Sequence, residues 1–171
     1  MSARVSSPVL VGRQRERELL RRVIERAAGG ETVLVTVGGD PGIGKTRLVQ
    51  DMAGTAVGLG FRVLTGGCLD VGEGTLPFGP VVEALRPLGT EADERWRSQV
   101  LGGSPALATL FPGLGLVPDA HVATGEGQVI EVVRGILDRL AARQPVLLVI
   151  EDAHWADAST RHVLLLSLIH I

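Results

Sequence analysis

One lysine stands in a glycine-rich segment whose residue types suit the binding of a phosphate chain. Lys45 is the only lysine among 171 residues, and every other basic residue except histidine is an arginine. It lies in the octet Gly39-Asp40-Pro41-Gly42-Ile43-Gly44-Lys45-Thr46, which fits the pattern G-x-x-x-x-G-K-[ST] of a phosphate-binding loop. The glycines would let backbone N–H groups surround the β-phosphate of a nucleotide. The ammonium would reach the β and γ oxygens, and the threonine hydroxyl would ligate Mg²⁺.

A second candidate for chemistry is the acidic pair Glu151-Asp152, which follows the apolar run 146–150. Buried apolar residues ending in paired acids are typical of a Walker B motif, in which one carboxylate holds the Mg²⁺ shell and the other orients the attacking water. Glu151 stands where Asp is more common, so its longer reach requires a bridging water, and Asp152 is the candidate for water activation. The alternative is that the acids only end a strand and cap the next helix. We favour the catalytic interpretation because a phosphate-binding loop precedes them by about a hundred residues.

The elements around the loop occur in the order that such a loop requires. Apolar spacing predicts a helix over 13–28 and, after the loop, a helix from 44 through 52. The β-branched run 32–37 predicts a buried parallel strand that leads into the loop, and 61–65 predicts a second strand.

The second half of the chain contains a short predicted helix over 80–86 and a clear amphipathic helix over 128–143, followed by the strand 146–150. Residues 87–125 are interrupted by Gly and Pro, with short helical patches over 91–101 and 106–111, and no role is assigned to them. Beyond the acids, Asp157 is predicted to cap the following helix.

Three other side chains have a structural and a functional interpretation. His154 is expected to pack rather than to contact the γ-phosphate side, and Trp155 is expected to anchor the core rather than to stack on adenine. Cys68, the single cysteine, is expected to be a small packed residue rather than a redox sensor.

Composition narrows the class of protein. The hydrophobic content of 45% and charged content of 21% are typical of a globular chain. A net charge of −2 gives no positive electrostatic field that would attract nucleic acid. One cysteine excludes an internal disulfide and a zinc cluster. The N-terminus lacks a basic start followed by an apolar run, so no signal peptide is expected. The apolar run from Val163 is too short to span a membrane. A cytoplasmic location is therefore expected.

The last residues, 166–171, match what one frame of a common transposon-type sequencing adaptor would encode. We interpret them as a non-native tail, the alternative being a natural apolar helix end. Residues 1–165 are then the N-terminal part of an AAA-type ATP-binding domain, and the native protein is expected to continue beyond them.

Four segments together resemble the AAA-type, STAND-class ATPase module of large ATP-binding LuxR-family regulators. They are Leu10-Val11-Gly12-Arg13 with Glu16, the loop with Arg47-Leu48, Leu76-Pro77-Phe78-Gly79-Pro80 with Glu83-Ala84-Leu85, and Val149 to Asp157. The last, which contains I-E-D-A-H-W-A-D, is the most specific.

The resemblance implies an α/β fold of the P-loop NTPase (ASCE/AAA) type, with a parallel sheet of order 5-1-4-3-2 flanked by helices. In that order the fourth strand separates the first from the third and would lie past residue 171. The sheet of this chain would then be incomplete, with unpaired strand edges and exposed apolar surface. We therefore expect the isolated chain to express poorly or to aggregate.

The resemblance also implies the nucleotide contacts and the partners. The cofactor-binding residues would be Val11, Gly12, Arg13, residues 39–46 and Arg47, with ATP or ADP as ligand and Mg²⁺ held by Thr46 and Glu151. For Arg13 the alternative is a solvated helix start. DNA would be bound only through downstream domains. Self-association is also expected, and a membrane partner is not.

The expected activity is Mg-ATP binding with slow hydrolysis, in which Lys45, Glu151 and Asp152 act on the triphosphate and the water. Nucleotide exchange would switch the output domains of a signalling or transcription regulator. The alternatives are a nucleotide-binding regulatory module without turnover, the same module attached to a cyclase or kinase, and a DNA-remodelling ATPase. The neutral-to-acidic charge and the His-Trp-Ala-Asp stretch disfavour the DNA-remodelling ATPase.

Overall fold

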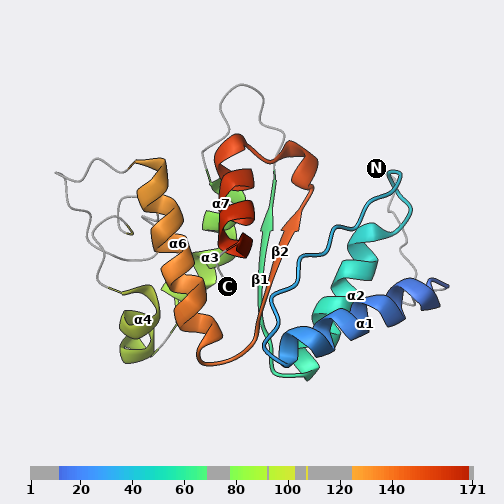
Figure 1. Ribbon diagram of the computed structural model, residues 1–171, viewed down its shortest axis with the longest axis horizontal. Helices are drawn as coiled ribbons and strands as arrows, with labels where there is room; N and C mark the ends of the chain where they lie inside the picture. The colour runs from blue at the N-terminus through green and yellow to red at the C-terminus, as the bar shows by residue number, and fades with distance from the viewer. Residues whose placement is uncertain (1–11, 69–77, 92, 103–106, 108–124, 170–171) are drawn as a thin grey trace, which may run out of the picture.

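Two adjacent parallel strands separate two groups of helices in the computed structural model (Figure 1), which describes residues 12–68, 78–91, 93–102, 107 and 125–169. Strand β1 (Arg62–Gly67) pairs with β2 (Val146–Glu151), and the register runs from Arg62 opposite Val146 to Gly67 opposite Glu151. The two predicted strands are therefore confirmed as parallel neighbours, as the order 5-1-4-3-2 requires of its second and third strands. The structure extends them to Gly67 and Glu151.

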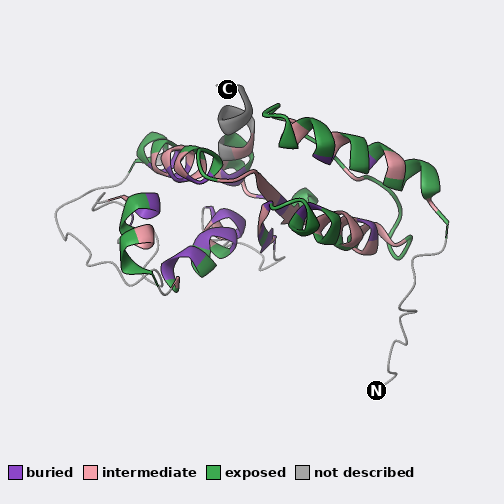
Figure 2. Ribbon diagram, turned by 90° about the horizontal axis from the view of Figure 1, so that it is seen from below, coloured by how far each residue is buried: buried purple, intermediate pink, exposed green. Residues whose placement is uncertain are grey.

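One side of the sheet carries the larger hydrophobic core. It is formed by α3 (Gly79–Gly89) and α6 (Glu126–Ala141), which contact the strands, and by α4 (Glu94–Leu101), which packs on both of these helices. Their buried side chains join Leu64 of β1 in one continuous cluster, and α3 is the most deeply buried of the helices (Figure 2). The cluster is made of aliphatic residues with one aromatic ring: Leu64, Phe78, Val81, Ala84, Leu85, Leu88, Val100, Leu101, Leu107, Val129, Ile130, Val133, Ile136 and Leu140.

Residues 87–125, which had no predicted role, contribute α4 to this core. The helix begins at Glu94 rather than at 91 because Asp93 caps it, accepting a hydrogen bond from the Trp96 N–H at 3.0 Å. Its other end is fixed by Arg139 of α6, which donates to the Val100 and Leu101 carbonyls at 2.6 and 3.2 Å. The predicted patch 106–111 lies outside the described residues apart from Leu107.

The opposite side of the sheet is covered by α1 (Gln14–Ala28) and α2 (Lys45–Gly58), which lie side by side (Figure 1). Its buried cluster is small and contains Ile24, Ala56 and Phe61. The chain ends after the short 3₁₀ turn η2 (Ala153–Trp155) and the helix α7 (Ala158–Ile169), which contacts α6 and α3.

The predicted strand over 32–37 is wrong for this structure. The segment runs without regular secondary structure between α1 and the loop, beside the sheet (Figure 1), and Leu34 is 63% exposed. Ladder hydrogen bonds need a neighbouring strand. Within the described residues β2 pairs with β1, and 32–37 belongs to no sheet.

Candidate functional site

The glycine-rich loop leads into the N-terminus of α2 through backbone conformations that favour glycine. Gly44 precedes the helix with φ of 91°, and Gly39 opens the loop with φ of 149°. A Cβ at Gly39 would lie 3.2 Å from Cγ2 of Ile43, so a side chain there would also crowd the loop. The glycines of the motif are therefore required by the shape of the loop in this structure.

Lys45 is the first residue of α2, and its side chain turns back over the loop. Its Nζ donates hydrogen bonds to the carbonyl oxygens of Gly39 and Asp40, at 2.9 and 3.1 Å. The ammonium therefore lies against the residues that begin the phosphate-binding motif.

The start of α2 supplies further donors for an anion. The first intrahelical acceptor is the Gly44 carbonyl, which accepts from Leu48 N–H at 3.1 Å, so the N–H groups of Lys45, Thr46 and Arg47 precede the helical ladder. Such N–H groups and the positive end of the helix dipole favour a phosphate. Thr46 is exposed, and buried Leu48 anchors this turn to the rest of the protein.

Arg13 contacts the loop. It lies immediately before α1 in the left-handed conformation, with φ of 57°, and its Nη2 donates to the Ile43 carbonyl at 2.5 Å. Arg13 is thus more than a solvated helix start, because it fastens α1 to the loop. Neighbouring Gly12 is exposed, and Val11 lies outside the described residues.

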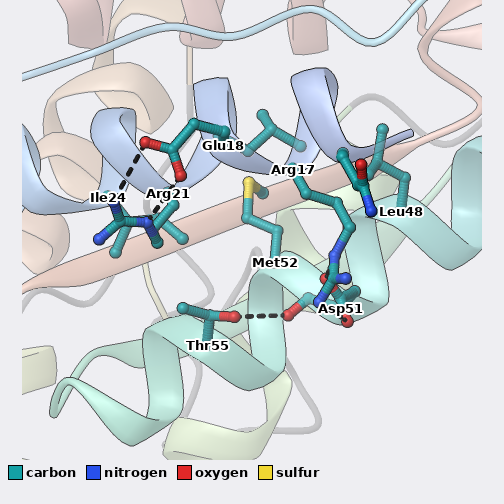
Figure 3. A pocket seen from close by; sticks show the side chains of 10 residues that line it. Arg17, Glu18, Arg21, Ile24, Leu48, Asp51, Met52 and Thr55 are labelled. Atoms are coloured by element: carbon teal, nitrogen blue, oxygen red, sulfur yellow. Dashed lines mark hydrogen bonds and ion pairs between the residues drawn. The ribbon is translucent and has the colours of Figure 1, made fainter. Parts of the chain in front are cut away.

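One turn further along α1, Arg17 forms an ion pair with α2. Arg17 Nε pairs with Asp51 Oδ2 at 2.8 Å, across a groove of about 260 Å³ between the two helices (Figure 3). The floor of the groove is apolar, with Leu20, Ile24, Leu48 and Met52 among its lining residues. None of the predicted site residues lines it, so the groove is separate from the phosphate-binding loop.

The acidic pair ends β2, as predicted. Glu151 is half-buried and is the last residue of the strand, and its carbonyl accepts a hydrogen bond from Cys68 N–H at 3.0 Å. Asp152 is exposed and adopts φ of 51°, a left-handed conformation that an aspartate tolerates better than most residues. Both the acids and the loop lie at the end of the sheet toward which the strands point (Figure 1).

The aromatic residues after the acids are not core residues. Trp155 is 47% exposed and His154 is exposed, and their ring centroids lie 5.1 Å apart. The predicted packing of both side chains is therefore wrong. The chain turns through η2 immediately after the strand, and this short turn leaves the two rings on the surface.

Asp157 caps α7 as predicted, since its carboxylate accepts hydrogen bonds from the N–H and the hydroxyl of buried Thr160. Burial alone would raise the pKa of Asp157, but the hydrogen bonds from Thr160 and from the Phe78 backbone outweigh it, so the pKa is lowered. Asp157 thereby joins the starts of α7 and α3, a contact that the sequence did not indicate.

Cys68 is packed, as predicted, with 6% of its surface exposed. Burial raises the pKa of its thiol, and the nearby carboxylates of Asp157, Asp152 and Glu83 raise it further. The thiol is therefore held in its neutral form, as expected of a packed residue.

The two proposed magnesium ligands, Thr46 and Glu151, come from different elements and do not form a cage by themselves. Within the ranges that the structure describes, no three His, Cys, Asp or Glu side chains are grouped to hold a metal ion. This donor set fits Mg²⁺ bound together with a nucleotide, because Mg²⁺ commonly uses one or two protein oxygens, phosphate oxygens and waters.

A parallel α/β sheet and a glycine-rich loop that opens a helix are features of the P-loop nucleotide-binding class, although the segment 32–37 before the loop forms no strand here. Comparison with protein families agrees: the AAA ATPase domain matches residues 9–171, and the chain belongs to that family. It is thus an AAA-type P-loop NTPase module. No curated protein and no solved structure matches the chain significantly. Among the helices of the described residues, none has the length and apolar character to cross a membrane.

Proposed function

We propose that this module binds Mg-ATP and hydrolyses it slowly. The observation that carries the proposal is the position of Lys45 Nζ, within hydrogen-bond distance of the Gly39 and Asp40 carbonyls at the N-terminus of α2. A cation there, beside helix N–H groups, suits a triphosphate. Family membership supports ATP as the nucleotide.

Each proposed residue has a chemical role in the reaction. Lys45 neutralises charge that develops between the β- and γ-phosphates, Thr46 and Glu151 hold the metal, and Asp152 orients or deprotonates the attacking water. When bound, Mg²⁺ supplies positive charge to the phosphate oxygens. Asp152 is exposed at the end of β2, so its carboxylate is accessible to water and nucleotide.

The remaining proposed ligands form the rim of the site. Gly39 to Gly44 and Arg47 would contact the phosphates, and Val11 and Gly12 would contact the adenine or the phosphates. Arg13 is bonded to the Ile43 carbonyl, which supports a role in shaping the loop beside any direct contact with the nucleotide.

In the parent protein the module acts as a cytoplasmic nucleotide switch. ATP and ADP would favour different arrangements of output domains, and hydrolysis would set the time spent in each. The resemblance to LuxR-family regulators supports a transcriptional output, with DNA contacted by other domains. The runner-up is a module that binds nucleotide without turnover, and it is favoured by Glu151 standing where the shorter Asp is more common.

Turnover and binding measured side by side separate these two functions. For the full-length protein we expect Asp152→Asn to lower kcat by about 100-fold while ATP affinity changes by less than about 2-fold. Asp138→Asn, on the exposed surface of α6, serves as the matched control. Equal turnover in the wild type and Asp152→Asn would refute the role of Asp152. A wild type that binds ATP but turns over no faster than the solution without protein would exclude hydrolysis, and the runner-up would hold.

A further inference from the structure

Two glutamates hold β1 at its opposite ends. At the amino end, Glu91 Oε2 pairs with the Arg62 side chain at 2.7 Å. At the carboxyl end, Glu83 Oε2 of α3 accepts a hydrogen bond from the backbone N–H of Gly67 at 2.8 Å. Only the second contact lies at the end of the sheet that carries the acidic pair.

A short chain of backbone contacts links Glu83 to that pair. Gly67 is opposite Glu151 in the parallel ladder, and the next residue, Cys68, donates its N–H to the Glu151 carbonyl. Glu83 therefore holds Gly67, the last residue of β1, and the next residue, Cys68, is bonded to the backbone of Glu151. Asp152 follows directly.

This end of the sheet needs such a contact because its own strand has little side-chain packing. Gly66 and Gly67 carry no side chain, and Gly66 lies so close to α3 that a Cβ would be 1.8 Å from the Pro80 carbonyl oxygen. Glycine backbones are intrinsically permissive. Besides the ladder with β2, α3 therefore supplies, through Glu83, a side-chain contact that the two glycines cannot make themselves.

We infer that Glu83 is a positioning residue, which holds the end of β2 through Gly67 so that Glu151 and Asp152 face the nucleotide in a fixed arrangement. The inference rests on the proposed function of the two acids. Glu83 itself is exposed and touches the backbone of β1, so its role does not require contact with substrate.

Cys68 provides a reporter for local opening at the carboxyl ends of β1 and β2, and this reporter does not depend on hydrolysis. It is the only cysteine of the chain, it is 6% exposed, and it adjoins Gly67. A thiol reagent can react with it only when the backbone around Gly67 and Cys68, at the carboxyl end of β1, opens locally. Removing the charge of Glu83 would also favour the thiolate, so a neutral variant that keeps the hydrogen-bond acceptor is needed.

The test compares Glu83→Ala, Glu83→Gln and Glu91→Ala in the full-length protein, with thiol modification read at Cys68 itself by peptide mass spectrometry. The glutamine retains an oxygen for Gly67 N–H, and Glu91→Ala removes the matched contact at the far end of β1. We expect Glu83→Ala to speed Cys68 modification about 10-fold, and Glu83→Gln and Glu91→Ala to change it by less than about 3-fold. Equal acceleration in the alanine and glutamine variants at residue 83 would assign the effect to charge and overturn the inference.

Nucleotide measurements on the same proteins decide whether the contact between Glu83 and Gly67 positions Glu151 and Asp152. We expect Glu83→Ala to lower kcat about 5-fold and to raise the Mg²⁺ concentration for half-maximal ATP binding about 5-fold. ATP affinity at saturating Mg²⁺ should change by less than about 2-fold, and glutamine should restore wild-type behaviour. Faster Cys68 modification without a change in the Mg²⁺ requirement would overturn the positioning role. A wild type without turnover would refute the proposed hydrolysis, and the Mg²⁺ requirement would then decide the inference alone.

Discussion

On one side of the β1–β2 sheet, α3, α4 and α6 bury a continuous set of apolar side chains, whereas α1 and α2 on the other side bury only a small cluster around Ile24, Ala56 and Phe61. The second side is also the one that carries the phosphate-binding loop, and next to it Leu34 and Val35 are exposed. The difference indicates that the described residues complete the scaffold on one side and leave the nucleotide side dependent on further contacts.

The largest expected effect comes from the complete side. Ile136→Ala would remove a fully buried side chain between α6 and the sheet and lower the free energy of unfolding by about 3 kcal/mol. Leu19→Ala, on the exposed face of α1, is the matched control and should cost less than about 0.5 kcal/mol. Urea denaturation measures both, and equal losses would mean that the two sides do not differ in this way.

A second test concerns the contact between β1 and α3. Gly66→Ala should cost about 3 kcal/mol because its Cβ would overlap the Pro80 carbonyl oxygen. At the adjacent Gly67 a Cβ would meet Glu83 Oε2 at 3.7 Å, an ordinary contact, so Gly67→Ala should cost less than about 1 kcal/mol. Comparable thermal midpoints for the two variants would contradict the close approach of α3.

Asp157 is expected to contribute a smaller, pH-dependent stabilisation. Asp157→Ala should cost about 1 kcal/mol at pH 7 through loss of the α7 cap. Because hydrogen bonds lower the folded-state pKa of Asp157, its contribution is complete above the unfolded pKa of about 4 and is lost as pH falls through the folded value. The difference in unfolding free energy between wild type and variant should therefore narrow below about pH 4. A difference that stays constant down to pH 2.5 would exclude this linkage.

The smallest change in stability is expected on the side of the sheet covered by α1 and α2, and there we also expect a change in the aggregation of the chain. Replacing both Leu34 and Val35 by threonine should alter the unfolding free energy by less than about 0.5 kcal/mol, since the side chains are exposed. The same variant should reduce aggregation of the chain, as measured by light scattering, because it removes an unpaired apolar segment. A wild-type chain that is monomeric and melts cooperatively would contradict the expected exposure of sheet edges.

Much of the scaffold could be predicted because its signals are local. The loop, α2, α6 and both strands follow from glycine placement, apolar spacing and β-branched runs, and the cap at Asp157 follows from its residue type. The segment 32–37 has the composition of a strand, but pairing depends on a neighbour that its own sequence does not encode.

The contacts that shape the site could not be predicted, since they join residues far apart in the chain. Arg13 bonds to the backbone carbonyl of Ile43, and Glu83 bonds to the backbone N–H of Gly67. Because both partners are backbone groups, their residue types in the sequence do not indicate these contacts. Trp155 was misjudged because large aromatic residues are usually buried, whereas here a short turn leaves the ring on the surface. The two acids that precede Trp155 in the sequence, Glu151 and Asp152, were the available signal that this turn lies on the surface.

The central claim is that the Lys45 ammonium binds the triphosphate, and ATP affinity in Lys45→Ala tests it most directly. By isothermal titration calorimetry we expect a loss of about 10- to 100-fold, corresponding to about 1.4–2.7 kcal/mol. Arg17→Ala removes one positive charge from the neighbouring α1 without touching the loop, and it should leave the affinity within about 2-fold. An unchanged affinity in Lys45→Ala, or an equal loss in the two variants, would contradict the account.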